Sequence, residues 1–448
     1  MQHLLCSYKK ILSKIYHLVL KNDTKSEIMN TVIDMRERVI LHCDINHCYA
    51  QIEEMKYPEL RNVAMAVGGH EESRHGIILT KNDIAKKYNI KTGESLRDAY
   101  KKCPHLLIIH PHYDDYLYYT EKVKDIYREY SDRVESFGLD EAWIDCTESV
   151  SLFGSGKEIA KIIQRRVLEE VGLTVSIGVS FNKIFAKLGS DMIKPMGLVE
   201  ITPDNFRQKA WPLPVSDLLY VGRSTKVKLE LFGIHTIGDL ATFDLAALKR
   251  NLGKMGEIIW WFANGYDQSE VALSGSVEDV KSIGNGITTP KDICNLEEAK
   301  IVFYVLCESV ASRAKEKGFA GKCVRIHLRN TELKSISRQK KFEKATNLTD
   351  EMMEVVMSLL KQNYDFSLPL RSVTITLDHL VNETEEVQLS LFEDVNKRKK
   401  TYDLEVVIDQ IRSHYGFNSV KRCSMLMDQT LTDFNPKGDH VIFPVSYF

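Results

Sequence analysis

The chain has 448 residues, of which 44% are hydrophobic, and its 60 Lys+Arg against 62 Asp+Glu give a formal net charge of −2. This length predicts about two to four globular domains. The near-neutral charge means that a basic surface for a polyanion must be local. Nine cysteines without a CxxC pair favour a reduced, cytoplasmic protein over a disulfide framework. The sequence has no run of about 18 apolar residues, so it predicts no membrane span.

The first half alternates strand-like apolar runs with helix-like amphipathic stretches, which is typical of an α/β or α+β domain. The expected strands are 39–43, 62–67, 76–79, 106–111 and 173–179, and the expected helices are 115–132 and 157–171. A helix-rich segment with turn glycines follows at about 204–270. Two helices, at 296–317 and 350–362, then alternate with strands at 322–329, 335–342 and 370–377, which predicts an antiparallel sheet. Residues 382–400 are polar and are expected to be flexible, before a last helix at 404–414.

Three acidic residues are candidate metal ligands. Asp44 ends the first expected strand, and Asp140 and Glu141 precede an apolar run. Carboxylate oxygens are the ligands that Mg²⁺ prefers, and a pair of such ions can promote phosphoryl transfer. Adjacent strand residues face opposite ways, so Asp140 and Glu141 can share one site only at a strand mouth or hairpin turn, which Gly138 permits. A solvated surface pair is the alternative explanation.

Cationic and hydroxyl residues lie beside the expected strand ends. Thr80 and Lys86 follow the strand at 76–79, and Lys194 lies in the stretch KPMG. Lysine ammoniums bind phosphate as point charges, although a solvated helix face would explain the same residues. The sequence contains neither GxxxxGK[ST] nor GxGxxG, so it supports neither a P-loop nor a Rossmann site.

A local basic stretch lies in the second half. Between residues 313 and 344 there are 11 Lys+Arg and three acids, a balance of +8 in a near-neutral chain. Cations spaced along one sheet face suit a nucleic-acid backbone, and a merely solvated sheet face is the alternative. The candidate DNA-binding residues are Arg325, Arg329, Lys334, Arg338 and Lys340.

One apolar pentapeptide interrupts the polar segment near the C-terminal end. Gln388, Leu389, Leu391 and Phe392 belong to the sequence QLSLF. Apolar side chains in a polar linker are costly unless a partner groove takes them. The alternative is that they pack back onto the protein's own surface.

Three motifs, in this order, resemble those of the Y-family DNA polymerases, the translesion enzymes, with the bacterial UmuC-like branch as the nearest match. DINHCYAQIEE at 44–54 is similar to D-x-(D/N)-x-(F/C)-(F/Y)-A-x-x-E. LDEAWID at 139–145 is similar to (I/L)-D-E-(A/S)-x-x-D. IGVSFNKIFAK at 177–187, followed by 191–197, is similar to G-(I/V)-(S/G)-x-(N/T)-K-x-x-A-K…K-P-x-G. The resemblance covers about residues 38–414, and QLSLF resembles the family's bacterial sliding-clamp peptide.

The resemblance implies an α+β multidomain fold, a right hand with palm, small fingers, helical thumb and a little-finger domain. The implied boundaries are an N-terminal extension at 1–37, palm at 38–67 and 106–203, fingers at 68–105, thumb with a helix-hairpin-helix-like turn at 204–270, linker at 271–279, little finger at 280–381 and a tail with the clamp peptide at 382–448.

The resemblance also implies catalytic roles. Asp44, Asp140 and Glu141, together with the backbone carbonyl of Ile45, would hold two Mg²⁺ ions. Tyr49 would be the steric gate, whose ring excludes a ribose 2′-OH.

Thr80, Lys86 and Lys194 would hold the nucleotide triphosphate. Two departures from the family pattern bear on binding. Asp83 stands where many relatives have a tyrosine that contacts the triphosphate, so its carboxylate should point away or pair with a lysine. Ser224 stands where the thumb hairpin usually has a glycine, which puts the backbone contact to a DNA phosphate there in doubt.

The leading hypothesis is therefore a DNA-directed DNA polymerase that adds dNTPs to a primer past lesions, as part of DNA damage tolerance. Its partners would be primer–template DNA, dNTPs and the sliding clamp, and we expect a cytoplasmic, nucleoid-associated monomer. Two alternatives stay open: a clamp- and DNA-binding scaffold that has lost synthesis, and a metal-dependent phosphodiesterase.

Overall fold

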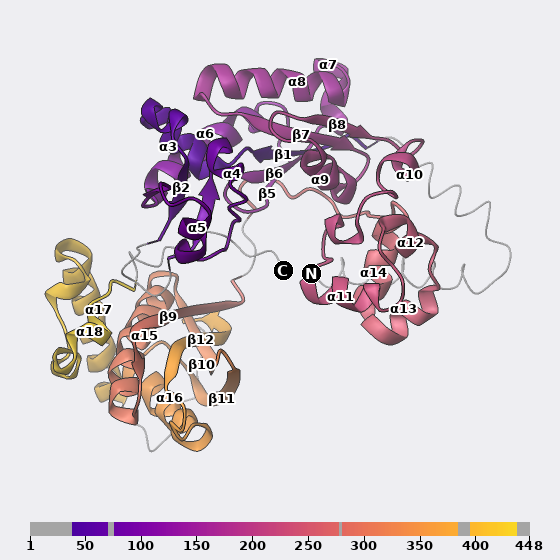
Figure 1. The fold of residues 1–448 in the computed structure, drawn as a ribbon. Helices are drawn as coiled ribbons and strands as arrows, with labels where there is room; N and C mark the ends of the chain where they lie inside the picture. The colour runs from indigo at the N-terminus through magenta and orange to yellow at the C-terminus, as the bar shows by residue number, and fades with distance from the viewer. Residues whose placement is uncertain (1–37, 70–75, 277–279, 384–394, 437–448) are drawn as a thin grey trace.

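The computed structural model describes residues 38–69, 76–276, 280–383 and 395–436. Its elements form a central unit on a five-stranded sheet, a small unit on a three-stranded sheet, a helical unit and a unit on a four-stranded sheet. Figure 1 shows the helical unit and the four-stranded unit on opposite sides below the central unit. Within these described ranges, no helix is long and apolar enough to cross a membrane.

The central sheet has β1 in its middle, in the order β5–β6–β1–β7–β8. Its strands are β1 (Ile40–Ile45), β5 (Val134–Ser136), β6 (Glu141–Asp145), β7 (Val175–Ser180) and β8 (Leu198–Ile201). β1 runs antiparallel to both neighbours. Every residue of β1 is buried, which explains why this strand appears in the sequence as a nearly continuous apolar run rather than an alternating one.

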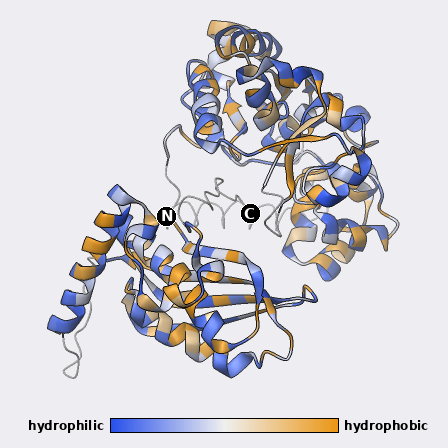
Figure 2. Ribbon diagram, turned by 60° about the vertical axis from the view of Figure 1, so that its left-hand side comes forward, coloured by the Kyte–Doolittle hydropathy of each residue, from blue (hydrophilic) through white to orange (hydrophobic). Residues whose placement is uncertain are grey.

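Helices cover both faces of this sheet. On one face Leu41, Cys43 and Ile45 belong to a core that also includes residues of α3, α6 and α8. The helices of this face are α3 (Cys48–Lys56), α6 (Tyr113–Arg128) and α8 (Gly156–Arg166), with the short helices η1 (Pro58–Asn62), η2 (Thr147–Ser149), α7 (Val150–Phe153) and η3 (Val167–Val171) nearby in sequence. In Figure 2 the helices carry both hydrophobic and hydrophilic residues, as expected for helices packed on one side only.

The opposite face holds α9 (Lys183–Met192). This helix approaches the sheet closely because β7 has a glycine at the contact. A Cβ atom on Gly178 would lie 1.9 Å from the carbonyl oxygen of Ala186. The absent side chain therefore brings α9 against the face of the sheet that carries Asp44.

The small unit contains β2 (Met65–Gly68), β3 (Ile78–Lys81), β4 (Leu107–Ile109), α4 (Asp83–Lys86) and α5 (Leu96–Lys102). Asn82 joins this unit to the central one. Its side chain caps α4 through the backbone N–H of Ala85 and donates to Glu54 of α3. The expected strand at 62–67 is shorter than predicted, because residues 58–62 form η1.

The helical unit contains α10 (Phe206–Lys209), η4 (Val215–Asp217), α11 (Arg223–Glu230), α12 (Ile237–Thr242), α13 (Leu245–Leu252) and α14 (Lys254–Ala263). Its helices meet at tight turns with Gly233 at φ 74° and Gly253 at φ 65°. Ser224 lies inside α11, and Gly222 before it has an ordinary φ of −74°. Position 224 therefore does not require the backbone freedom of glycine, and the left-handed residue of this turn is Tyr220 at φ 71°.

The four-stranded unit is antiparallel, in the order β11–β10–β12–β9. Its elements are β9 (Ser282–Ile293), α15 (Leu296–Glu316), β10 (Phe319–Asn330), β11 (Ser335–Thr346), α16 (Thr349–Asn363) and β12 (Leu370–Asn382). One face, which includes Val324, Ile326 and Ile375, packs against both helices in a common core. The expected order of strands and helices is observed here.

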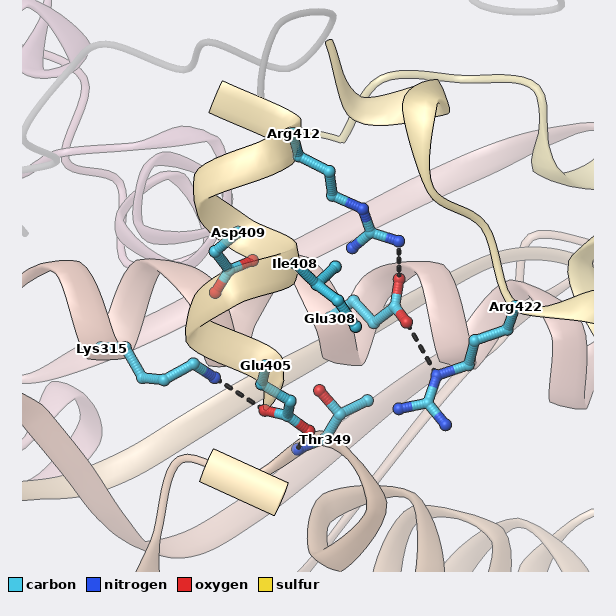
Figure 3. Close-up of a pocket in the computed structure, with 8 residues that line it drawn as sticks. All are labelled: Glu308, Lys315, Thr349, Glu405, Ile408, Asp409, Arg412 and Arg422. Carbon is cyan, nitrogen blue, oxygen red and sulfur yellow. Dashed lines mark hydrogen bonds and ion pairs between the residues drawn. The ribbon is translucent and has the colours of Figure 1, made fainter. Parts of the chain in front are cut away.

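The C-terminal segment contains more structure than the sequence predicts. α17 (Val395–Tyr415) begins within the stretch expected to be flexible, and η5 (Phe417–Ser419), η6 (Cys423–Met427) and α18 (Gln429–Thr432) follow it. Figure 3 shows the contact with the four-stranded unit, where Lys315 pairs with Glu405, and Arg412 and Arg422 both pair with Glu308, each at 2.8 Å. The described part of this tail is therefore packed on the four-stranded unit.

Candidate active site

Three carboxylates meet where β1 ends and β6 begins. Asp44 lies directly opposite Glu141 in the antiparallel register, so the two side chains share a face. Asp140 precedes β6, and its carbonyl oxygen accepts a hydrogen bond from the backbone N–H of Ile45 at 3.0 Å. Gly138 has φ 87° in the hairpin turn between β5 and β6. The predicted hairpin turn is thus present beside these acids.

Two lysines from the segment after β7 lie among these acids. The ammonium of Lys187 lies 2.9 Å from Glu141, 2.9 Å from Asp191 and 3.5 Å from Asp44. The ammonium of Lys194 lies 2.7 Å from Asp44 and 2.9 Å from Asp191. Asp191 therefore holds both cations against the two cross-strand carboxylates.

The electrostatics of the cluster favour cations. Burial and the Asp44 and Glu141 carboxylates raise the pKa of Asp140 to about 6. Burial and Glu141 also raise the pKa of Asp44, although both lysines oppose that shift. The pKa of Lys187 is raised because Glu141, Asp191 and Asp44 together outweigh its burial. The ammoniums of Lys187 and Lys194 therefore partly neutralise the negative charge of Asp44 and Glu141.

The donor set fits a hard divalent cation, since it consists of carboxylate oxygens that repel one another when unpaired. In the described parts of the chain, no group of three or more acidic, histidine or cysteine side chains is arranged as a ready metal site. Instead the two lysine ammoniums lie between the carboxylates. Divalent ions would therefore have to displace these ammoniums from Asp44 and Glu141.

Tyr49 lies in α3, five residues after Asp44. Its ring stacks on the ring of Tyr116, with centroids 4.4 Å apart and an interplanar angle of 8°. Tyr116 is fully buried, and its hydroxyl donates to the Glu53 carboxylate at 2.5 Å. The Tyr49 ring therefore has a rigid support beneath it.

The expected triphosphate residues lie on the small unit and after α9. Thr80 is half-buried in β3, and Lys86 is exposed at the end of α4. Burial and the nearby charge of Lys86 lower the pKa of Lys81, although Glu94 opposes that shift, so two cations lie close together here. Asp83 is exposed, and its charge acts on the imidazole of His47.

The little-finger cations do not form the single face that their spacing predicts. Arg325 and Arg329 lie opposite Gln339 and Ser335, whereas Arg338 and Lys340 lie opposite the buried Ile326 and Val324. Cross-strand partners share a face, so the two pairs of cations point to opposite sides of the sheet. Lys334 lies in the turn before β11, where it pairs with Glu332 at 2.8 Å. Arg325 is also already paired, with Asp378 at 2.9 Å.

Three residues of the cluster received no role from the sequence. Lys187 and Asp191 lie within the third motif, and their spacing of four on one helix face was a usable signal. His42 gave no such signal, because it lies in an apolar strand. The pentapeptide at 388–392 lies outside the described residues.

Comparisons with known proteins bear on this geometry. The profile of the impB/mucB/samB family matches residues 43–191, that of its C-terminal domain matches 280–391, and that of the DNA polymerase-iota thumb domain matches 216–267. A DNA polymerase IV of Acetivibrio thermocellus is 44% identical over 395 residues, 88% of this chain and 99% of that protein. The DNA polymerase IV 2 of Bacillus subtilis is 34% identical, over 88% of this chain and 95% of that protein.

The chain belongs to the Y-family of DNA polymerases. A solved Y-family DNA polymerase chimera shares its fold, with a TM-score of 0.67, 23% identity and coverage of 77% of this chain and 99% of the other. The Y-family fold with palm, thumb and little finger is therefore confirmed. The finer assignment to a UmuC-like branch is corrected, because the similar relatives carry the name DNA polymerase IV.

From the raised pKa of Asp140 we predict how the free energy of unfolding of this Y-family polymerase depends on pH when no metal is added. The folded chain binds the Asp140 proton more tightly than the unfolded chain does, so the stability that this group contributes is fully present below its ordinary pKa of 3.8 and is lost as the pH rises from there through about 6. Asp140→Asn removes the buried charge. At pH 8 in EDTA it should raise the free energy of unfolding by about 1–3 kcal/mol.

Urea unfolding followed by tryptophan fluorescence measures this difference. The difference between variant and wild type should shrink as the pH falls towards 4. A variant that is less stable than the wild type at pH 8, or a difference that does not change with pH, would contradict the electrostatic account.

Proposed function

We propose that Asp44, Asp140 and Glu141, with the carbonyl of Ile45, hold two Mg²⁺ ions with which this translesion DNA polymerase joins dNTPs to a primer end. The observation that carries the proposal is the cross-strand register of Asp44 with Glu141, beside the turn that presents Asp140. When bound, such ions stabilise the attacking primer oxygen and the leaving pyrophosphate of an in-line displacement.

The two lysines have different parts in this proposal. Lys187 is only 14% exposed and is held by three carboxylates, so it serves as a counter-charge on α9 that keeps Asp191 as a partner when Glu141 binds a cation. Lys194 is 35% exposed and contacts Asp44 at the edge of the cluster. Its ammonium can leave Asp44 for the nucleotide triphosphate while Asp191 stays within reach.

Thr80 and Lys86 complete the proposed triphosphate site from the fingers. Support comes from the lowered pKa of Lys81, which has burial as its main cause and the charge of Lys86 as the second. A polyphosphate placed here would relieve the repulsion between the two ammoniums. We therefore add Lys81 to the residues proposed to bind the triphosphate.

Tyr49 is the proposed steric gate against ribonucleotides. A gate excludes a 2′-OH only if its ring cannot retreat, and the Tyr116 ring beneath it is buried and anchored to Glu53. The Tyr113 ring meets Tyr49 edge-on, with centroids 6.1 Å apart. The stack thus supplies the stiffness that exclusion requires.

DNA and dNTPs are the substrates of this polymerase. For the duplex backbone, we assign the exposed cations on both sides of the β10–β11 edge, with Arg329 on one side and Arg338 and Lys340 on the other. Arg325 and Lys334 must first exchange their present acidic partners for phosphates.

The segment at 388–392 is the proposed contact with the bacterial sliding clamp. Support comes from its apolar sequence in a polar stretch and from its position between β12 and α17. An apolar peptide of this kind needs a partner groove.

Single replacement of Asp44, Asp140 or Glu141 by alanine tests the metal assignment. Each variant should lower the rate of primer extension with Mg²⁺ by about three orders of magnitude, a size usual for removing a main electrostatic group. Labelled primer–template, dNTPs and gel analysis measure it, with Glu148→Ala as the control because that carboxylate is exposed in the same domain.

Product analysis separates the alternatives. A primer that the wild type lengthens and the three variants leave unchanged supports the proposal. Shortened primer would indicate a phosphodiesterase, and DNA binding without any extension would indicate a scaffold. Normal extension by all three variants would refute the carboxylate assignment.

The clamp proposal has its own test. Leu391→Ala with Phe392→Ala should weaken binding to purified sliding clamp by at least about tenfold, since both apolar anchors are lost. Surface plasmon resonance measures it, and Ser390→Ala is the matched control. Distributive extension without clamp should stay at the wild-type rate. Unchanged clamp affinity would refute the assignment.

A further inference from the structure

His42 is a buried polar residue in the palm that the proposed chemistry does not use. It lies on β1 two residues before Asp44, so both side chains face α9. Its side chain has no exposed surface. Its ring packs edge-on against Trp143 of β6, with centroids 5.1 Å apart and an interplanar angle of 66°.

The two ring nitrogens of His42 reach two different elements. Nδ1 lies 2.8 Å from the hydroxyl of Ser190 on α9, and Nε2 lies 3.3 Å from the carboxylate of Glu141 on β6. The Ser190 hydroxyl has one hydrogen to donate and lies 2.8 Å from both Nδ1 and the carbonyl oxygen of Lys187. We assign that hydrogen to Nδ1, so the neutral ring carries its own hydrogen on Nε2, where it can donate to the Glu141 carboxylate.

This chain of contacts links a proposed metal ligand to the helix that carries its counter-charge. Ser190 and Trp143 fix the plane of the imidazole, and the fixed ring presents Nε2 to Glu141. Trp143 is itself fixed, because its indole N–H donates to the carbonyl of Lys183 at 2.9 Å. The 3.3 Å between Nε2 and the Glu141 carboxylate is slightly longer than a usual N–H···O hydrogen bond.

We propose that His42 is a positioning residue, which holds the Glu141 carboxylate in the rotamer that binds metal. The inference rests on the proposed role of Glu141 as a metal ligand. Partners behind a metal ligand commonly set its orientation, and their loss typically costs about 10- to 100-fold in metal affinity. When Lys187 yields Glu141 to a cation, His42 remains as the contact that keeps this carboxylate from swinging away.

The test compares three replacements of similar size or chemistry. His42→Leu fills the space without any polar atom. His42→Gln can place an amide nitrogen near the position of Nε2, whereas the shorter side chain of His42→Asn reaches only towards Ser190. Ser180→Ala is the control, because the hydroxyl of this buried serine of β7 donates to the carbonyl of Ile201 in the same sheet.

Mn²⁺ binding to the complex of full-length protein with primer–template, followed by electron paramagnetic resonance, gives a readout that needs no turnover. His42→Leu and His42→Asn should weaken Mn²⁺ binding about 10- to 100-fold. His42→Gln should restore it to within about threefold of the wild type. The half-saturating Mg²⁺ concentration for extension should follow the same order, while the KM for dNTP at saturating Mg²⁺ stays near the wild-type value.

The outcomes are distinguishable. Unchanged Mn²⁺ affinity in His42→Leu and His42→Asn, or equal losses in the Gln and Leu variants, would overturn the positioning role and leave only a packing role. If His42→Leu fails to fold, the Gln and Asn variants decide the question together with Ser190→Ala, which should also weaken Mn²⁺ binding. If Glu141→Gln itself leaves Mn²⁺ binding unchanged, the proposed metal site has failed rather than the role of His42.

Discussion

The ion pairs of Lys187 and Lys194 with the buried acids are the interaction on which the palm depends. Asp44 is buried and lies opposite the partly buried Glu141 on the neighbouring strand, and two such carboxylates side by side would be costly without cations. The lysines reach them only because α9 lies close to the sheet, and Gly178 allows that approach. The register of the sheet, the packing of α9 and the balance of charge thus all determine the environment of the Asp44 and Glu141 carboxylates.

The repulsion among these buried carboxylates destabilises the fold, and the proposed catalysis makes use of that repulsion. Burial, together with the neighbouring carboxylates of Asp44 and Glu141, raises the pKa of Asp140 to about 6. Residues placed for chemistry commonly lower the stability of the resting fold. A divalent cation would remove this repulsion, so the same feature that destabilises the metal-free palm would favour metal binding.

The sequence predicted which acids the structure brings together, but not the residues that support them. Asp44, Asp140 and Tyr49 were identifiable because strand ends and motif spacing mark them. His42 was hidden because a polar residue in an apolar strand reveals its partners only when α9 and β6 are placed beside it. Arg325 and Arg338 point to opposite faces of the sheet because of the register between β10 and β11. The spacing of residues within each strand does not determine that register. The early start of α17 involves tertiary contacts such as the ion pair of Arg398 with Glu351.

Anomalous diffraction from a ternary complex with primer–template, a non-hydrolysable dNTP and Mn²⁺ tests the central claim most directly. The account predicts two metal peaks about 4 Å apart between Asp44, Asp140 and Glu141, with Lys194 moved from Asp44 to the triphosphate. Retention of both lysine ammoniums on Asp44 and Glu141, with no metal between these carboxylates, would contradict it.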